Sequence, residues 1–399
     1  MSYKIISINV VTLFFMIHQP LLAMDFHGYL RSGVGVNGKG GDQVCFQAPG
    51  AKSKYRLGNE CETYSELSFS EQVYKDKDGA TFKLGATMAF VVDAAEDWEQ
   101  FNPAWREVYV EGGKLFSSKA WKNARFWAGK KFYRRHDVHI NDFFFWDNSG
   151  AGAGIDDINL GQSKLAYAFR RNNENNERAI TQHDIRWYEL DTNQNGQLTL
   201  GLNLIRSDES QDGFNGENGM QFHILHQQDK FLGGFNKFAI QYGQGAGATL
   251  SNAPDDTLNS SEKTIRIVEQ LLFNKGNDWS GLFTAVYEEQ KNKQTWQSMG
   301  IRPIYHFSKR FNLAVELGID EVNPKNGASR TMTKLTIAPQ ISADFGFWSR
   351  PVLRAFVTYA NWNTAARLAA DTTDTIGING VFGNKTSGLS YGIQAEAWW

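Results

Sequence analysis

Long apolar runs and proline are the features that this sequence most clearly lacks. After residue 23 no stretch approaches roughly 18 continuous apolar residues, so we expect no membrane-spanning helix. Proline occurs only 8 times in 399 residues, whereas glycine occurs 38 times. Mean hydropathy is negative, at −0.44, yet aromatic residues make up 14% of the chain. Together these values are typical of many β-strands joined by Gly, Asn and Asp turns.

The chain also lacks an excess of charge and any recognisable catalytic motif. Its formal net charge is −2, which gives no reason to expect a nucleic acid as a partner. No credible Ser-His-Asp or Cys-His set is present, and Gly150–Gly154 is not followed by the Lys-Ser/Thr of a phosphate-binding loop. Asp191–Gly196 resembles the start of a calcium loop, but Leu202 stands where Glu is required, which favours an Asn-Gly hairpin turn. We therefore expect neither an enzyme nor a bound cofactor.

Only two cysteines are present, Cys45 and Cys61. Their even number and their closeness favour a disulfide in an exported chain, and the alternative is a pair of free thiols. The enclosed segment is polar and rich in Gly and Lys, and we expect it to belong to an external loop. Closing a loop of about 15 residues should stabilise the folded chain by up to about 3 kcal/mol.

The N-terminal residues 1–23 have the organisation of a secretory signal peptide. Lys4 supplies a short basic region, Ile5–Ile17 is mostly apolar, and Leu21–Ala23 offers a cleavage site. A membrane anchor is the alternative, although the apolar run is short for a bilayer. We expect residues 24–399 to form the mature protein as a single domain.

Apolar and polar residues alternate along the segments 197–204, 236–242 and 311–320. A soluble sandwich and a membrane barrel both produce this alternation, and the pattern alone does not separate them. Around residues 105–109 both faces of the predicted strand mix polar and apolar residues, so the alternation does not identify which face is apolar. A barrel strand with its connection takes about 20 residues, so residues 24–399 suffice for on the order of 18 strands, within the range of aqueous channels. Together with the signal peptide, this favours an all-β protein, a transmembrane antiparallel β-barrel of about 18 strands.

The last predicted strand places aromatic residues on both of its faces. Ile393 and Trp399 share one face, whereas Glu396 and Trp398 share the other. A terminal aromatic on the lipid face suits the aromatic girdle of a membrane barrel. Trp398 then points into the lumen, where stacking on a sugar ring would explain an indole in water. Tyr29 shares the lumen face of the first strand with charged residues in the same way.

The stretch Arg134–Asp147 combines two arginines, two histidines, three carboxylates and four aromatics. Ionised groups beside flat apolar rings suit a sugar, because its hydroxyls accept and donate hydrogen bonds while its C–H faces stack on aromatics. His136, His139 and Asp142 also have the spacing of metal ligands, but the adjacent arginines would repel a cation, so we expect no metal. An ordinary polar loop is the remaining alternative. The stretch is too polar to face lipid, and we expect it to fold into the lumen.

This stretch, RRHDVHINDFFFWD followed by SGAGAGI, resembles the constriction-loop region of the maltoporin family. The segments DFHGYLRSG, SKYRLGNECETYSEL, GFNKF, WSRP and the terminal Trp-Trp match the same family in the same order. The resemblance covers nearly all of the chain after residue 24 and is thin near 160–230 and 362–385. It implies a homotrimeric, 18-stranded porin in contact with lipid in the outer membrane of a Gram-negative bacterium. It also implies a constriction loop and facilitated diffusion of maltose and maltodextrins.

The resemblance further implies an aromatic slide and an ionic track along the lumen. Carried over by motif, the slide is Tyr29, Tyr64, Trp98, Phe235, Trp348 and Trp398. The track is Arg31, Arg56, Glu66, Arg106, Arg135, Asp137 and Asp142. Phe144 stands in the constriction where the family usually has Tyr, so the ring is kept and the hydroxyl is lost. A porin of the same architecture for another oligosaccharide is therefore an alternative, and a general diffusion porin, which needs no aromatic row, is a weaker one.

Overall fold

The computed structural model describes residues 24–93, 103–172, 179–208 and 215–399. Within them, one antiparallel sheet contains 18 strands, as expected from the length of the chain. The strands are β1 (Asp25–Asn37), β2 (Glu62–Lys75), β3 (Thr81–Asp93), β4 (Ala104–Gly113), β5 (Arg125–Lys131), β8 (Gly150–Asn159), β9 (Lys164–Asn172), β10 (Ile180–Asn193), β11 (Gly196–Ser207), β12 (Gly219–Phe231), β13 (Gly234–Gly245), β14 (Lys263–Lys275), β15 (Trp279–Gln290), β16 (Gln294–His306), β17 (Phe311–Pro324), β18 (Arg330–Ser342), β19 (Val352–Trp362) and β20 (Ser387–Trp398).

Five short elements lie outside this sheet. They are β6 (His136–Val138) and β7 (Phe143–Trp146), which pair with each other, the 3-10 helices η1 (His139–Asn141) and η2 (Ala246–Thr249), and the helix α1 (Thr364–Ala369). In the described part of the chain, no helix has the length and apolar composition needed to cross a membrane.

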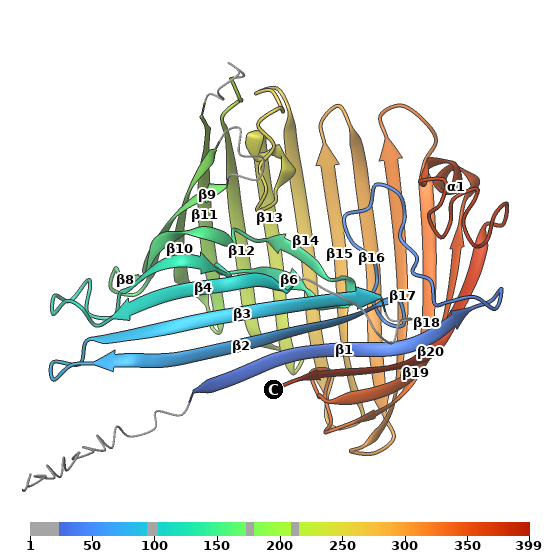
Figure 1. Ribbon diagram of the computed structural model, residues 1–399, viewed down its shortest axis with the longest axis horizontal. Helices are drawn as coiled ribbons and strands as arrows, with labels where there is room; N and C mark the ends of the chain where they lie inside the picture. Colours follow the sequence, from blue (N-terminus) through green and yellow to red (C-terminus); the bar gives the residue numbers. More distant parts are fainter. Residues whose placement is uncertain (1–23, 94–102, 173–178, 209–214) are drawn as a thin grey trace, which may run out of the picture.

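The sheet closes on itself because its first and last strands pair. β1 is hydrogen-bonded to β2 on one side and to β20 on the other, with Tyr29 opposite Trp398. The remaining strands pair in chain order, so the sheet is an antiparallel barrel (Figure 1). Closure leaves no free sheet edge, which is the condition for a β-structure to lie in a bilayer. The expected β-barrel of about 18 strands is confirmed.

The two ends of the barrel differ in the lengths of their connections. The longest described connections, 38–61, 132–149, 246–262 and 363–386, all lie at one end. Tight turns such as 194–195 and 232–233 lie at the other end, together with the C-terminus (Figure 1). Outer-membrane barrels have short periplasmic turns and longer external loops. The end with the long connections is therefore the external end.

The expected alternation of faces is present along the strands. In β20 the exposed fraction of Ile393 is 60%, whereas that of Gln394 is 5%. β4 departs from this rule because its pairing with β3 shifts register between Thr87 and Met88. Such a β-bulge changes the face on which later side chains lie. Trp105 is therefore exposed on the outer face, although it has an odd number and the outward residues after it, Val108 and Val110, have even numbers. This shift explains the mixed pattern in the sequence.

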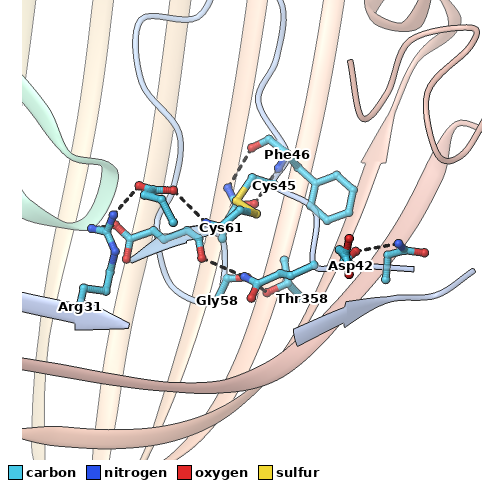
Figure 2. Close-up of a disulfide and its surroundings, with 12 residues drawn as sticks. Arg31, Asp42, Cys45, Phe46, Gly58, Cys61 and Thr358 are labelled. Atoms are coloured by element: carbon cyan, nitrogen blue, oxygen red, sulfur yellow. Dashed lines mark hydrogen bonds and ion pairs between the residues drawn. A yellow bond between two sulfur atoms is a disulfide. The ribbon is translucent and has the colours of Figure 1, made fainter. Parts of the chain in front are cut away.

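The β1–β2 connection starts at the external end, as expected, but it folds into the barrel and does not extend outward as an external loop. It carries the predicted disulfide between Cys45 and Cys61, whose Cα atoms are 6.0 Å apart (Figure 2). Leu57 is fully buried, and its backbone N–H donates to Glu316 on β17 at 2.9 Å. The carbonyl of Gly58 accepts from the Thr358 hydroxyl on β19 at 3.0 Å. Polar groups of the segment form hydrogen bonds with the polar inner wall of the barrel. The composition of the segment therefore resembles that of a surface loop.

A tyrosine and two glycines fix this connection against the wall. Tyr55, 2% exposed, lies over Gly300 on β16 and Gly318 on β17. A Cβ atom added to either glycine would lie 2.0 Å from the tyrosine ring. The Tyr55 hydroxyl is 2.9 Å from the Ser298 hydroxyl. The absence of two side chains on adjacent strands thus forms a notch that receives one ring.

The β5–β8 connection also lies inside the barrel, as the polar and aromatic stretch predicted. Trp146 is fully buried over Gly201 on β11, where an added Cβ would lie 2.3 Å from the indole. The carbonyl of Phe145 accepts from Gln241 on β13 at 2.8 Å and from Arg266 on β14 at 3.0 Å. The constriction segment is therefore held by strands far from it in sequence. The hydrophobic core of the protein lies between these inward-folded connections and the wall.

Candidate functional site

The inward-folded segments leave a cavity of about 530 Å³ against the inner faces of the first and last strands. Its lining is strongly polar and also aromatic. It contains all seven residues of the expected ionic track, three residues of the expected slide and Phe144. The lining residues are Tyr29, Arg31, Arg56, Glu62, Tyr64, Glu66, Val91, Arg106, Arg135, Asp137, His139, Asp142, Phe144 and Trp398.

Three aromatic rings of this cavity form a row, and a fourth ring continues it. The centroids of Tyr64 and Tyr29 are 6.0 Å apart, and those of Tyr29 and Trp398 are 6.5 Å apart with a 22° angle between the planes. Trp348, from the turn between β18 and β19, extends the row at 6.2 Å from Trp398. Each ring comes from a different element, and the antiparallel pairing of β2, β1 and β20 aligns the first three.

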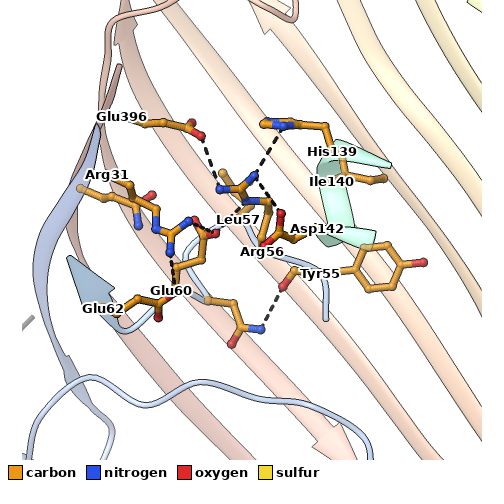
Figure 3. A network of polar contacts seen from close by, with 12 residues as sticks. Arg31, Tyr55, Arg56, Leu57, Glu60, Glu62, His139, Ile140, Asp142 and Glu396 are labelled. Carbon is orange, nitrogen blue, oxygen red and sulfur yellow. Dashed lines mark hydrogen bonds and ion pairs between the residues drawn. The ribbon is translucent and has the colours of Figure 1, made fainter. Parts of the chain in front are cut away.

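A network of charged side chains that includes Arg31, Arg56, Glu60 and Glu396 lies beside these rings (Figure 3). Arg56, from the β1–β2 connection, donates to the Tyr29 hydroxyl at 2.6 Å, and that hydroxyl donates to Glu396 at 3.0 Å. Arg56 also forms an ion pair with Glu60 at 2.7 Å, and Arg31 pairs with the same carboxylate at 2.6 Å. Arg31 and Arg56 are thus paired with a carboxylate of the protein, which leaves them able to exchange hydrogen bonds without holding a ligand as a full ion pair.

A second group of stacked side chains surrounds the constriction. The Arg135 guanidinium carbon lies 3.5 Å from the Phe132 ring centroid and 4.8 Å from that of Phe144. Arg106 lies 5.4 Å from the Phe132 ring. Such cation–π contacts orient both partners. Phe144, in β7, is therefore a supported ring whose exposed fraction is still 39%.

Phe144 and Asp142 also line a second cavity of about 570 Å³. Its lining also includes residues of the β13–β14 connection, the β15–β16 turn and Lys52 of the β1–β2 connection, all from the external end. Asp142 and Phe144 therefore separate an external vestibule from the inner cavity. This is the place where a constriction is expected.

His139 is a member of the site that the sequence reasoning considered only as a metal ligand. Its ring is 5.1 Å from Trp348 and 5.9 Å from Trp398, and its two nitrogens lie 3.5 Å from nitrogens of Arg56 and Arg350. Burial and the neighbouring Arg56 guanidinium hold the pKa of His139 well below its usual range. A neutral imidazole is therefore packed between two guanidinium groups and the aromatic row.

His136 is also used for packing, since its ring lies 5.3 Å from Trp146. Among the described residues, no group of three His, Cys, Asp or Glu side chains could hold a metal ion.

The two remaining residues of the expected slide are Trp98 and Phe235. Trp98 and the predicted signal peptide lie outside the described residues. Phe235 lies on β13, away from the row, and the Lys237 ammonium is 4.9 Å from its ring. Arg350 was missed by the sequence reasoning, although the WSRP match around Trp348 contains it.

A closed barrel with an apolar outside, a polar lumen and an internal constriction defines an outer-membrane porin, a channel rather than an enzyme. The model of the LamB porin family matches residues 24–399, and the chain belongs to this family, the maltoporins. The protein is accordingly a β-barrel of the outer membrane.

Solved structures agree with the fold. Pseudomonas aeruginosa OpdQ is similar with a TM-score of 0.52 at 6% identity, over 94% of this chain and 98% of that one. Pseudomonas aeruginosa OccK3 (OpdO) is similar with a TM-score of 0.51 at 9% identity, over 94% and 95% of the two chains. At such identities the likeness shows the fold alone.

Proposed function

We propose that this porin gives facilitated diffusion of maltose and maltodextrins through its aromatic slide and ionic track. The observation that carries the proposal is the row from Tyr64 to Trp348 beside seven ionised side chains in one lumen. Apolar C–H faces of a pyranose stack on such rings, and its hydroxyls exchange hydrogen bonds with the charged groups.

The spacing of the rings suits the movement of a sugar along the lumen and does not suit tight binding at one site. Neighbouring ring centroids are 6.0–6.5 Å apart, so a sugar leaving one ring meets the next without returning to bulk water. Conduction requires sites that are favourable to enter and weak enough to leave. Because Arg31 and Arg56 are already paired with Glu60, they supply hydrogen bonds of moderate strength.

A porin of the same architecture for a different oligosaccharide is the second candidate. It is favoured by Phe144, which presents a ring but no hydroxyl where the two cavities meet. A general diffusion porin is disfavoured, because it has no need for four aligned rings with polar anchors.

Three further parts of the proposal rest on family membership. We propose that residues 1–23 are removed on export, that residues 24–399 form one barrel domain, and that three copies assemble as a homotrimer. The apolar outer faces of the strands contact lipid, and Trp98 and Phe235 offer the sugar further stacking surfaces apart from the row.

Bilayer conductance titrated with a panel of sugars tests the proposal. Maltose and maltodextrins should block the ion current saturably, with affinity rising with chain length as more rings are covered. Sucrose and a β-linked glucose oligomer of equal length provide the comparison for the second candidate. An ion current that no sugar blocks saturably would remove the proposal in favour of a general diffusion porin.

A further inference from the structure

The indole of Trp398 has a neighbour that no motif pointed to. Trp398 is the penultimate residue of the chain, on the last strand. Tyr29 and Trp348 lie beside its ring at 6.5 Å and 6.2 Å, and His139 approaches with its edge at 5.9 Å. The Arg350 guanidinium is closer than any of these, with its central carbon 4.3 Å from the ring centroid. At this distance a planar cation stacks on the face of the indole.

Arg350 is itself held firmly in the turn between β18 and β19. Its Nε donates to Glu396 at 2.9 Å, and its Nη1 donates to the carbonyls of Phe347 at 3.2 Å and Ser349 at 2.9 Å. The side chain is 5% exposed. Since a guanidinium is planar and its donors have fixed directions, these bonds fix the plane of the group as well as its position.

We propose that Arg350 is a positioning residue for the Trp398 platform, and the proposal rests on the sugar-conducting function above. The fixed guanidinium occupies one face of the indole and sets its tilt. A sugar ring therefore stacks on the opposite face only, in line with Tyr29. A pyranose with one continuous C–H face fits such a one-sided platform, whereas a ring with axial hydroxyls on that face does not.

Arg354 provides a matched control within the same network. It lies on β19, is 3% exposed, and donates to the same carboxylate of Glu396 at 2.6 Å and to Gln394 at 2.9 Å. Among the described residues it makes no cation–π contact with Trp398, unlike Arg350. Exchange of either arginine for lysine keeps the charge beside Glu396, but only the exchange at 350 removes a stacked plane from the indole.

The test compares Arg350→Lys with Arg354→Lys in bilayer recordings of maltodextrin block. Arg350→Lys should weaken block by about threefold to tenfold, mainly through faster sugar dissociation, with ion conductance unchanged. Arg354→Lys should stay within about twofold of the wild type. A merely electrostatic role for Arg350 would be rescued by lysine, so wild-type block in Arg350→Lys, or equal losses in both variants, would overturn the proposal.

A double-mutant cycle with Trp398→Phe tests whether Arg350 acts through this indole. The losses should be non-additive, and additive losses would contradict the proposed route. Arg350→Gln serves the same cycle if the lysine variant does not insert into membranes.

Near-UV circular dichroism supplies a readout that needs no sugar. The indole band should change in Arg350→Lys and not in Arg354→Lys, and an unchanged band would overturn the positioning role. If the wild type showed no sugar block, the proposed function would fail, while this spectrum would still decide the role of Arg350.

Discussion

Phe144 is the position at which pore width and hydrogen bonding can be separated by mutation. It lines both cavities, is 39% exposed, and is supported from one side by the Arg135 guanidinium at 4.8 Å. Phe144→Ala removes the ring where the external vestibule meets the inner cavity. We expect a clear rise in single-channel conductance, because the removed atoms are replaced by water. Phe144→Tyr keeps the ring, so we expect nearly unchanged conductance.

Sugar binding should respond differently in the two variants. A stacking ring contributes about 0.5–1.5 kcal/mol beyond the area that it buries, so Phe144→Ala should weaken block by up to about tenfold. One net hydrogen bond contributes about 0.5–1.5 kcal/mol, so the hydroxyl of Phe144→Tyr should tighten block by at most about tenfold. The signs of the two effects on affinity are opposite, while only the alanine variant changes the conductance.

Single-channel recording with maltodextrin titration measures both quantities in one experiment. Phe116→Ala is a suitable control, because Phe116 is 52% exposed in the turn between β4 and β5, outside both cavities. The control should keep wild-type conductance and wild-type block. An alanine variant at 144 with wild-type conductance would show that this ring is not at the narrowest point.

The structure makes three other predictions. Gly318→Leu should expel the β1–β2 connection and raise the conductance, because an added Cβ would lie 2.0 Å from the Tyr55 ring. The control Tyr55→Phe keeps the ring in its notch and should conduct like the wild type. A Gly318→Leu channel with unchanged conductance would refute the packing of Tyr55 in this notch. The double exchange of Cys45 and Cys61 for Ser should lower the free energy of unfolding by about 3 kcal/mol, given a sequence separation of 16, and equal denaturant midpoints for wild type and variant would contradict this. Burial depresses the pKa of His139 in the folded protein, so its neutral form stabilises the fold fully above about pH 6.5, the unfolded value, and progressively less as the pH falls below it. The melting temperature of the wild type, measured from pH 7.5 to pH 4.5, should therefore fall more steeply than that of His139→Gln, and parallel curves would exclude the effect.

The fold could be predicted because it depends on local patterns. Alternation with a period of two is a property of each strand by itself, and it assigned Ile393 to the outside and Glu396 to the lumen before any pairing was known. The limit of this reasoning was β4, where a bulge shifts the register and parity no longer identifies the face. The count of strands followed from length, since the bilayer fixes the length of each strand.

The composition of the candidate site could be predicted from motifs, but its geometry could not. All seven residues expected in the ionic track line one cavity, although they come from strands and from two inward-folded connections. The family motif assigned Arg56 to the lumen, but composition did not place the rest of the segment around Tyr55 inside the barrel, because a polar loop can hydrogen-bond equally well to water and to a polar lumen wall. Its position became clear only when Gly300 and Gly318 were seen side by side on adjacent strands.

By itself, the sequence determined the antiparallel barrel, the two faces of its strands, the disulfide pair and the charged residues that line the inner cavity. The tertiary structure decided which of these residues are neighbours. The row from Tyr64 to Trp348 exists because β1 closes the barrel between β2 and β20 and a turn brings a fourth ring beside them. His139 and Arg350 meet at that row from positions 211 residues apart. Periodicity is encoded over a few residues, whereas such contacts depend on the register of every strand pair and on closure of the whole sheet.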